Sequence, residues 1–247
     1  MLVSTPAIVL HSFKYGDTSK IVRLLTREHG VQSAIAKGAF RAKSQFGARL
    51  QSLSQGVAQI YVKQTRDLQT LGAFDVTDQR STLADDVRRY AAAAALAELV
   101  LRLAPEERNP HVFDLLSESL DRLATAPDET IGAIALAALW QMIATLGFSP
   151  SLDDCARDGR PVPAGAARFS VADGGFLCQG CAAQSEASKL PADDREVLVR
   201  LVNGSAEVGP LSARREAAHR RLLARFVRRH ASEDRELGAL AFWEEQS

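Results

Sequence analysis

A change in hydrophobic period near residue 80 constrains the fold of this chain more than any other feature. Before it, five short stretches are predicted to be strands, at 7–10, 21–25, 31–35, 57–62 and 68–74, and apolar and polar residues alternate in 31–35 and 57–62. Alternation of this kind is typical of β-strands that bury one face. Gly30, Gly56 and Asp67 separate the stretches and favour turns. Five short strands without a helical segment predict a small closed barrel, because closure leaves no unpaired sheet edge.

After residue 80 the apolar residues recur at helical spacing. Helices are expected at 82–103, 112–123, 131–146, 193–202 and 212–230, followed by a short tail. The segment 131–146 is apolar nearly all round, which is typical of a buried central helix. Residues 150–187 have no regular period. We therefore expect a multidomain α+β chain, with a barrel at 1–80, a helical domain at 81–149 and 188–247, and an insertion at 150–187.

The insertion contains all three cysteines of the chain. Cys178 and Cys181 form a C-x-x-C knuckle, and Cys155 with Asp158 forms a second knuckle with Asp in its second place. The 19 residues between Asp158 and Cys178 match the spacing of a zinc ribbon, and a carboxylate can replace a thiolate on zinc. A segment of 38 residues with almost no core needs such an ion to fold. The predicted ligands of a structural Zn²⁺ are Cys155, Asp158, Cys178 and Cys181.

Two alternatives stay open for this segment. Asp153 and Asp154 compete with Asp158 as the fourth ligand, and the segment could instead be a vestigial hairpin with free thiols. A catalytic zinc would need an open position and a general base nearby. No His lies between Cys155 and Cys181, and H-E-x-x-H occurs nowhere, so the expected ion is structural.

The formal net charge is zero, but the charge is unevenly distributed. Residues 1–80 hold 11 Lys and Arg against 5 Asp and Glu, a local excess of +6. A polyanion responds to such a local field. The loop 37–49 is basic and contains Phe40 and Phe46, and aromatic rings can stack on unpaired bases. The alternative is that both rings pack on the barrel and the cations are only solvated. The predicted DNA contacts of this region are Arg23, Arg27, Lys37, Phe40, Arg41, Lys43 and Arg49.

The last long helix carries a second set of cations. Five arginines fall within roughly a 100° arc of this helix, and its apolar residues face the other way. An ordinary amphipathic helix with an arginine-rich surface explains the pattern equally well. As a second phosphate track, its DNA contacts would be Arg214, Arg221, Arg225, Arg228 and Arg229.

Several motifs together resemble the bacterial RecO family of recombination mediators. The first is Tyr-Gly-Asp-Thr-Ser-Lys-Ile-Val at 15–22, followed by Glu-His-Gly at 28–30 and Ala-Lys-Gly-Ala-Phe-Arg at 36–41. The cysteine segment with Gly174 and Gly175 completes the set, and the resemblance covers essentially the whole chain. Two positions depart from the family pattern. Asp158 stands where a fuller ribbon has Cys, and Phe40 stands in a turn that is often basic.

The resemblance implies a fold and a function. The implied fold is a five-stranded OB-type barrel followed by an α-helical domain with an inserted zinc-ribbon-like hairpin. The implied function is recombinational DNA repair without enzymatic activity, through binding of single- and double-stranded DNA and annealing of complementary strands. The implied partners are RecR, RecF, single-strand-binding protein and RecA.

The remaining sequence features are consistent with this function. No Walker A, nucleophile-elbow or acid–base motif occurs, so no nucleotide cofactor is expected. A zinc-dependent hydrolase and a protein-only scaffold remain the alternative functions. No apolar run reaches about 18 residues, and the N-terminus lacks the pattern of a signal peptide. Three cysteines are too few for a disulfide-stapled secreted fold, so we expect a cytoplasmic, nucleoid-associated protein.

Overall fold

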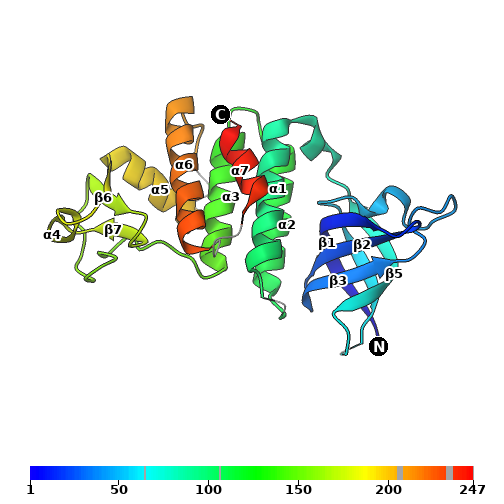
Figure 1. Ribbon diagram of the computed structural model, residues 1–247. Helices are drawn as coiled ribbons and strands as arrows, with labels where there is room; N and C mark the ends of the chain where they lie inside the picture. Colours follow the sequence, from blue (N-terminus) through cyan, green and yellow to red (C-terminus); the bar gives the residue numbers. More distant parts are fainter. Residues whose placement is uncertain (64, 106, 205–207, 232–235, 247) are drawn as a thin grey trace. The chain divides into compact units, whose positions relative to one another are not determined.

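The computed structural model describes residues 1–63, 65–105, 107–204, 208–231 and 236–246 (Figure 1). The chain divides into two compact units, Met1–Thr125 and Ala126–Ser247. The first unit contains a β-barrel and two helices. The second contains a helical bundle and a small three-stranded sheet.

Five strands close the barrel of the first unit. They are β1 (Leu2–Tyr15), β2 (Ser19–Thr26), β3 (Gly30–Ala36), β4 (Gln55–Tyr61) and β5 (Leu68–Asp78). Their order around the barrel is β1-β2-β3-β5-β4, and the long β1 pairs with both β2 and β4. Only the β3–β5 pair is parallel. This arrangement confirms the expected five-stranded OB-type barrel.

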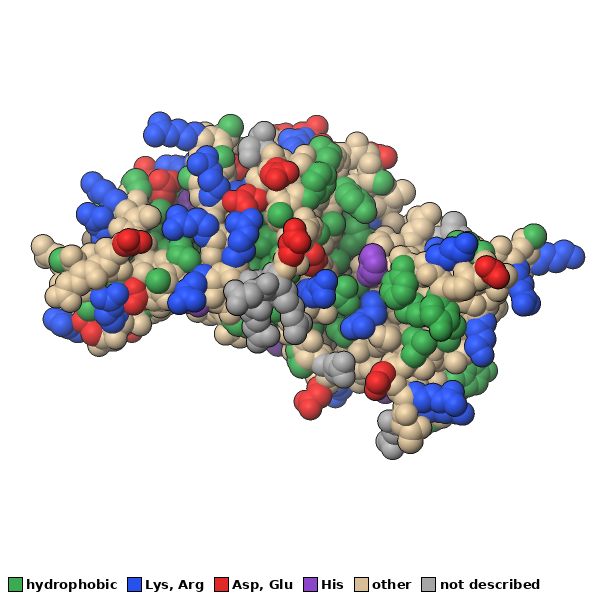
Figure 2. All heavy atoms as spheres, in the orientation of Figure 1, with side chains coloured by type: hydrophobic (Ala, Val, Ile, Leu, Met, Phe, Trp, Pro, Cys, Tyr) green, Lys and Arg blue, Asp and Glu red, His purple; other side chains and the backbone are tan. Residues whose placement is uncertain are grey.

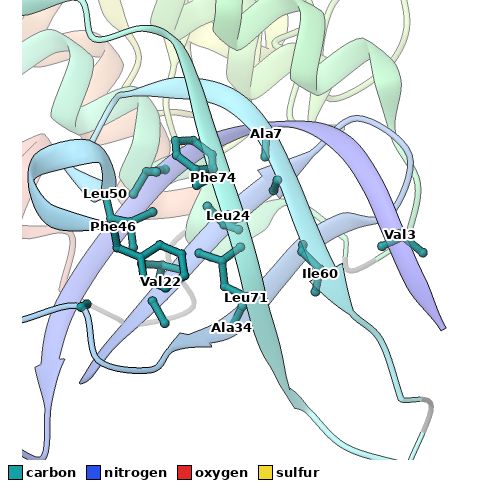
Figure 3. Close-up of a cluster of buried hydrophobic side chains, with 14 residues drawn as sticks. Val3, Ala7, Val22, Leu24, Ala34, Phe46, Leu50, Ile60, Leu71 and Phe74 are labelled. Atoms are coloured by element: carbon teal, nitrogen blue, oxygen red, sulfur yellow. The ribbon is translucent and has the colours of Figure 1, made fainter. Parts of the chain in front are cut away.

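Alternate residues of the strands fill the barrel. The inward side chains include Val22 and Leu24 of β2 and Phe74 of β5, which meet in one buried cluster (Figure 3). The loop after β3 contributes Phe46 and Leu50, which enter the same cluster beside a short 3-10 helix at Gly47–Leu50. The barrel core therefore depends on one loop as well as on its strands.

A β-bulge changes which residues of β1 face the core. Val9 is opposite Leu24, but His11 is already opposite Arg23, so Leu10 is an extra residue in β1. A one-residue shift moves every later side chain to the other face of a strand. Val9 points into the core cluster, whereas Phe13, at an odd position like Val9, is 44% exposed.

Helices α1 (Val87–Leu103) and α2 (Pro110–Thr125) complete the first unit. The carboxylate of Asp86 caps α1 by accepting from the backbone N–H groups of Arg88 and Arg89. The residues before this cap, expected to belong to the helix, form a 3-10 helix at Ser81–Asp85 instead. The helix thus starts where its first unpaired N–H groups find an acceptor.

Buried Arg80 joins the barrel to α2 within this unit. It follows β5, and its backbone is left-handed, with φ 46°. Its guanidinium donates to the carboxylate of Asp121 at 2.7 Å, to the Leu53 carbonyl at 3.2 Å, and to Gln55 and Ser117 at 2.6 and 3.2 Å. A buried cation needs such partners, because an unpaired charge away from water costs several kcal/mol, roughly.

The second unit is built around α3 (Ile131–Thr145). Helices α5 (Ala192–Asn203) and α6 (Ala213–His230) pack against it, and α7 (Gly238–Glu245) packs against α6. The expectation of a central buried helix is correct, since Trp140 of α3 is fully buried against Phe226 of α6, with ring centroids 5.2 Å apart. Ser212 caps α6. The expected short tail contains α7, which Arg220 holds through the Trp243 and Gln246 carbonyls at 2.7 and 2.6 Å.

A small hairpin lies between α3 and α5 in sequence. It consists of β6 (Ala167–Ser170) and β7 (Gly175–Leu177), with the short α4 (Gln179–Ala182) and β8 (Ser188–Leu190) after it. The strand order is β7-β6-β8. The rings of Phe169 and Phe176 meet edge to face at 5.7 Å. The expected inserted hairpin is thus present, with β8 as a third strand that sequence periodicity did not predict. None of the described helices is both long and apolar enough to span a membrane.

Candidate functional site

Two short turns bring together the four predicted metal ligands, Cys155, Asp158, Cys178 and Cys181. The first turn is closed by backbone hydrogen bonds from Gly159 to the Cys155 carbonyl at 2.8 Å and from Cys155 to the Arg160 carbonyl at 2.7 Å. The second follows β7, where Cys178 immediately precedes α4. The three sulfurs and a carboxylate oxygen of Asp158 all lie within 4.8 Å of one another. Among the described residues, Asp153 and Asp154 do not belong to this cluster.

The carboxylate of Asp158 is bound by the thiols around it. Cys181 and Cys178 donate to its Oδ2 at 3.2 and 3.4 Å, and Arg160 pairs with it at 2.9 Å. Hydrogen bonds from the Cys155 and Cys181 thiols hold the pKa of Asp158 well below its usual range. The reciprocal hydrogen bond to Asp158 raises the pKa of Cys181 to about 12. Without a cation, the Asp158 carboxylate therefore keeps its charge and the Cys181 thiol keeps its proton.

The chemistry of this donor set fits zinc. Zinc–ligand bonds of about 2.0–2.3 Å require the ligands of one ion to lie within roughly 4.6 Å of one another, close to the spread in this cluster. Cys155 is buried, and Cys178 and Cys181 are half-buried beside Leu177 and Ala187. An ion that replaced the thiol protons would join the two turns at the base of the hairpin. All four positions would be filled by protein, which is the arrangement of a structural site.

The basic loop after β3 is fixed at both ends. The Phe40 N–H donates to the Thr18 carbonyl at 2.9 Å, and the Gln45 side chain donates to the Gly72 carbonyl at 2.7 Å. Phe46 is buried in the barrel core. The four cations of the loop are all exposed, and no ion pair within the described residues involves them. They are Lys37, Arg41, Lys43 and Arg49.

The two aromatic residues of this loop lie in different environments. Phe46 is 3% exposed, whereas Phe40 is 49% exposed and has the Lys20 ammonium 5.4 Å from its ring centroid. The sequence could not separate stacking from packing for these two rings. Phe46 is a packing residue of the barrel, and only Phe40 is free to contact a ligand.

Arg23 and Arg27, the predicted contacts on and after β2, differ in their partners. Arg27 binds the Asp114 carboxylate of α2 through two hydrogen bonds of 2.9 Å. This pair raises the pKa of Arg27 and compensates its charge. Arg23 is half-buried on β2, and its Nε is buried without a hydrogen-bond partner among the described residues. Of these two predicted contacts, Arg23 is therefore the one without a carboxylate partner among the described residues.

The predicted arginines of α6 are all exposed, namely Arg214, Arg221, Arg225, Arg228 and Arg229. Arg228 forms an ion pair with Glu244 of α7. Arg221 and Arg225 line a pocket of about 340 Å³ whose walls include Phe169, Leu190 and Leu222. Lys189 lies on the same pocket. This apolar pocket with cations around it was not predicted, because its walls come from β6, β8 and α6, which are far apart in sequence.

Comparisons with known proteins agree with this architecture. The family model described as Recombination protein O N terminal matches residues 1–80, and Recombination protein O C terminal matches residues 84–236. A protein of Anaeromyxobacter dehalogenans (strain 2CP-C) is 34% identical over 251 residues, which cover 98% of this chain and 96% of that protein. A protein of Nocardioides sp. is 34% identical over 248 residues, covering 99% of this chain and 100% of the relative. A Bacillus pumilus protein is 34% identical over 192 residues, or 77% and 72%.

The barrel, the helical region and these matches define a class, the OB-barrel proteins of DNA repair and recombination. All three relatives are named DNA repair protein RecO. The chain belongs to the RecO family.

Proposed function

We propose that this protein is a DNA-binding recombination mediator and not an enzyme. It binds single- and double-stranded DNA and anneals complementary strands without a nucleotide cofactor. With RecR and RecF, it helps to load RecA onto strands coated by single-strand-binding protein. It works in the bacterial cytoplasm, in association with the nucleoid.

The observation that carries this proposal is the exposed loop 37–49. Its cations have no carboxylate partners among the described residues, and both of its ends are held by hydrogen bonds and by Phe46. When these cations neutralise phosphates, the DNA releases the counterions condensed on it, which favours binding of any DNA sequence. Phe40 adds one exposed ring, and base–aromatic stacking strengthens the binding of unpaired strands.

Annealing requires two polyanions to be held together. The barrel loop and α6 offer two separate groups of cations on one chain, and each can bind one strand or a duplex. Holding both strands raises their effective concentration for each other. Base pairing supplies the driving force, so that no hydrolysis is needed. We expect annealing by the protein alone to be independent of ATP.

The zinc-ribbon-like hairpin has a structural role in this proposal. Cys155, Asp158, Cys178 and Cys181 would hold one Zn²⁺, which would supply a cross-link between the two turns and no catalytic function. The hairpin forms one wall of the pocket on α6 through Phe169. Loss of the ion would therefore alter that pocket and leave the barrel unchanged.

The pocket supports single-strand-binding protein as a partner. An acidic apolar peptide tail, which such proteins typically carry, needs an apolar groove with cations at its rim, and the pocket combines Leu190 and Leu222 with Arg221 and Arg225. Asp194 also lines the pocket, but Arg215 pairs with it at 2.6 Å. The pocket therefore presents more available positive than negative charge.

A salt titration tests the proposal against its alternatives. We expect the logarithm of the DNA affinity to fall linearly with the logarithm of the salt concentration, for single strands and duplexes of any sequence. The same preparation should accelerate annealing of complementary strands in the absence of ATP. A protein-only scaffold would not bind DNA, and a zinc hydrolase would cleave its substrate only in the zinc-loaded form. Absence of DNA binding, or an ATP requirement for annealing by the protein alone, would refute the mediator function.

A further inference from the structure

A further pocket, here called the hairpin pocket, lies on the small sheet of the second unit. It has a volume of about 630 Å³, within the range of about 300–1,000 Å³ that is usual for ligand pockets. Its walls come from the loop before β6, from β6 and β7, and from the short α4, and they include Val162, Leu177 and Ala182. None of the described residues that line it is acidic or aromatic. The pocket is therefore apolar, and its only charges are positive.

The hairpin pocket and the pocket beside α6 lie on opposite faces of the three-stranded sheet. Arg168 of β6 lines the hairpin pocket, whereas Phe169, the next residue, lines the pocket beside α6. Successive side chains of a strand point to opposite faces of its sheet. Lys189 belongs to β8, which is a strand at the edge of the sheet, and it borders both pockets. The two pockets are separate sites that share only this residue among those that line them.

One row of side chains across the sheet supplies the charge of the hairpin pocket. Arg168 is directly opposite Leu177 of β7 on one side and Lys189 of β8 on the other. Like charges directly opposite each other destabilise a pair of strands. Both cations are exposed, and no ion pair within the described part of the chain involves either of them. Several Lys and Arg side chains lie over the region of β6, β7 and α5 (Figure 2). An anion bound between Arg168 and Lys189 would relieve their repulsion.

The loop wall of the hairpin pocket is held in place by Arg195 of α5. Its guanidinium donates to the Val162 and Gly165 carbonyls at 3.2 and 3.4 Å. It also donates to the Pro163 carbonyl, and it lies over the Phe176 ring at 4.8 Å from the ring centroid. A wall that is fixed before a ligand arrives loses less conformational entropy on binding. The pocket is therefore preformed.

We propose that the hairpin pocket binds an extended acidic peptide of a partner protein, with apolar side chains against Val162 and Leu177 and carboxylates at Arg168 and Lys189. The apolar walls require a ligand with apolar side chains, and the two opposed cations require one with negative charge. A peptide that alternates carboxylates with apolar residues combines both. A nucleic acid is also negative, but no ring in these walls can stack on its bases. This inference goes beyond the proposed function, because it adds a peptide site on the hairpin.

Fluorescence anisotropy with the full-length protein tests the chemistry of the ligand. The probe is a fluorescein-labelled peptide in which Asp alternates with Leu. Two comparison peptides replace every Asp with Lys or every Leu with Ser. We expect the comparison peptides to bind more weakly by on the order of tenfold or more, because one lacks the charge and the other the apolar side chains. Equal binding of all three peptides would refute the proposal.

The two pockets must be separated in this measurement, since the pocket beside α6 also accepts acidic apolar peptides in the proposed function. The titration is therefore repeated in the double variant Arg221→Glu with Arg225→Glu, which reverses the charge at the rim of that pocket. We expect this variant still to bind the probe. Hydrogen exchange at saturating peptide should then show added protection in 162–168 and 179–183. Protection only in α6 and β8 would place the peptide elsewhere and refute the hairpin pocket.

Three variants of the hairpin pocket complete the test in the same background. Arg168→Glu should weaken the acidic probe by on the order of tenfold and favour the Lys peptide, because attraction and repulsion exchange. The matched control Arg168→Lys keeps the charge and should retain binding. Ala183→Trp changes an exposed residue of the wall and should block the pocket without altering any charge. Circular dichroism would verify that each variant is folded.

The outcomes separate this proposal from DNA binding. If neither Arg168→Glu nor Ala183→Trp weakens the acidic probe, the hairpin pocket is refuted, while the proposed function survives. The affinity for oligothymidine should be the same in Arg168→Glu as in the wild type. A loss of oligothymidine binding in this variant with unchanged peptide binding would assign the pocket to nucleic acid and also refute the proposal. A wild type that binds the peptide but no DNA would refute the proposed function alone.

Discussion

Replacing Phe46 with Ala should destabilise the barrel without removing any charge or any exposed ring. Phe46 is 3% exposed and packs in one cluster with Leu24, Leu71 and Phe74 (Figure 3). Deletion of a buried Phe side chain typically costs about 3–5 kcal/mol, because transfer energy is lost and a cavity remains. Single domains have free energies of unfolding of about 5–15 kcal/mol, so the barrel would retain a small margin.

The two-unit architecture makes this loss measurable. Both tryptophans, Trp140 and Trp243, lie in the second unit, so tryptophan fluorescence reports its unfolding. Hydrogen exchange followed by mass spectrometry reports the barrel through its own peptides. We expect barrel peptides to lose protection by about 3–5 kcal/mol while the tryptophan transition keeps its midpoint. A loss in the barrel below about 1 kcal/mol would refute the assignment of Phe46 to the core.

Phe40→Ala is the matched variant in the same loop. Because Phe40 is 49% exposed, its removal should change the free energy of unfolding by less than about 0.5 kcal/mol. Its single-strand affinity should fall, since one stacking ring is lost. Equal effects of Phe40→Ala and Phe46→Ala on barrel protection would contradict the different environments of the two rings.

Three other predictions follow from charges and ligands. Simultaneous charge reversal of Lys37, Arg41 and Lys43 should reduce the salt-dependence slope for single strands by about 2, since each lost phosphate contact contributes about 0.7; an unchanged affinity would exclude the loop from DNA binding. Cys178→Ser should lower the zinc content, measured by plasma emission spectrometry of protein purified without chelator. It should reduce hydrogen-exchange protection only around 150–187. Wild-type protein that contains no zinc would contradict the metal site. A hydrogen bond from the Arg88 guanidinium lowers the pKa of Asp86 to about 2 from its usual 3.8, so its stabilising effect should be complete above about pH 4 and lost as the pH falls towards 2. Asp86→Asn should remove that part of the acid destabilisation of the first unit, as measured by hydrogen exchange.

The sequence was sufficient to predict the architecture because the strands and helices have clear periods. The five barrel strands and the helices α1 to α3, α5 and α6 overlap the segments where the periodicity placed them, although β1 is longer than the expected 7–10 and α1 begins at Val87. The bulge at Leu10 could not be predicted in this way. Residues 7–10 are apolar throughout and give no alternation to follow, and only the pairing with β2 shows which residue is extra. Helix α7 was expected to be a tail because it is short and is held mainly by distant contacts from Arg220.

The candidate site was predictable where its residues are close in sequence. Asp158 joins the three cysteines because the knuckle spacing already specifies the turn. The partner of Arg27 was not predictable, since Asp114 is 87 residues away and belongs to another element. The pocket beside α6 was not predictable for the same reason, because its walls meet only in the folded unit. The two rings of the basic loop are both phenylalanines within the same short segment, so the sequence could not separate their roles. Only the tertiary packing distinguishes them.

The extra residue in β1 has an evolutionary consequence. Before Leu10, Leu2 to Ile8 pair with β4 and Ala7 to Val9 pair with β2, whereas after it the strand pairs with β2 alone. Deletion of this single residue would turn Phe13 and Tyr15 inward and Ser12 and Lys14 outward while the register with β4 is kept. A one-codon deletion or insertion could thus exchange an aromatic surface for a polar one in a single step. Ligand preference in a barrel of this kind can therefore diverge through changes in length as well as through substitutions.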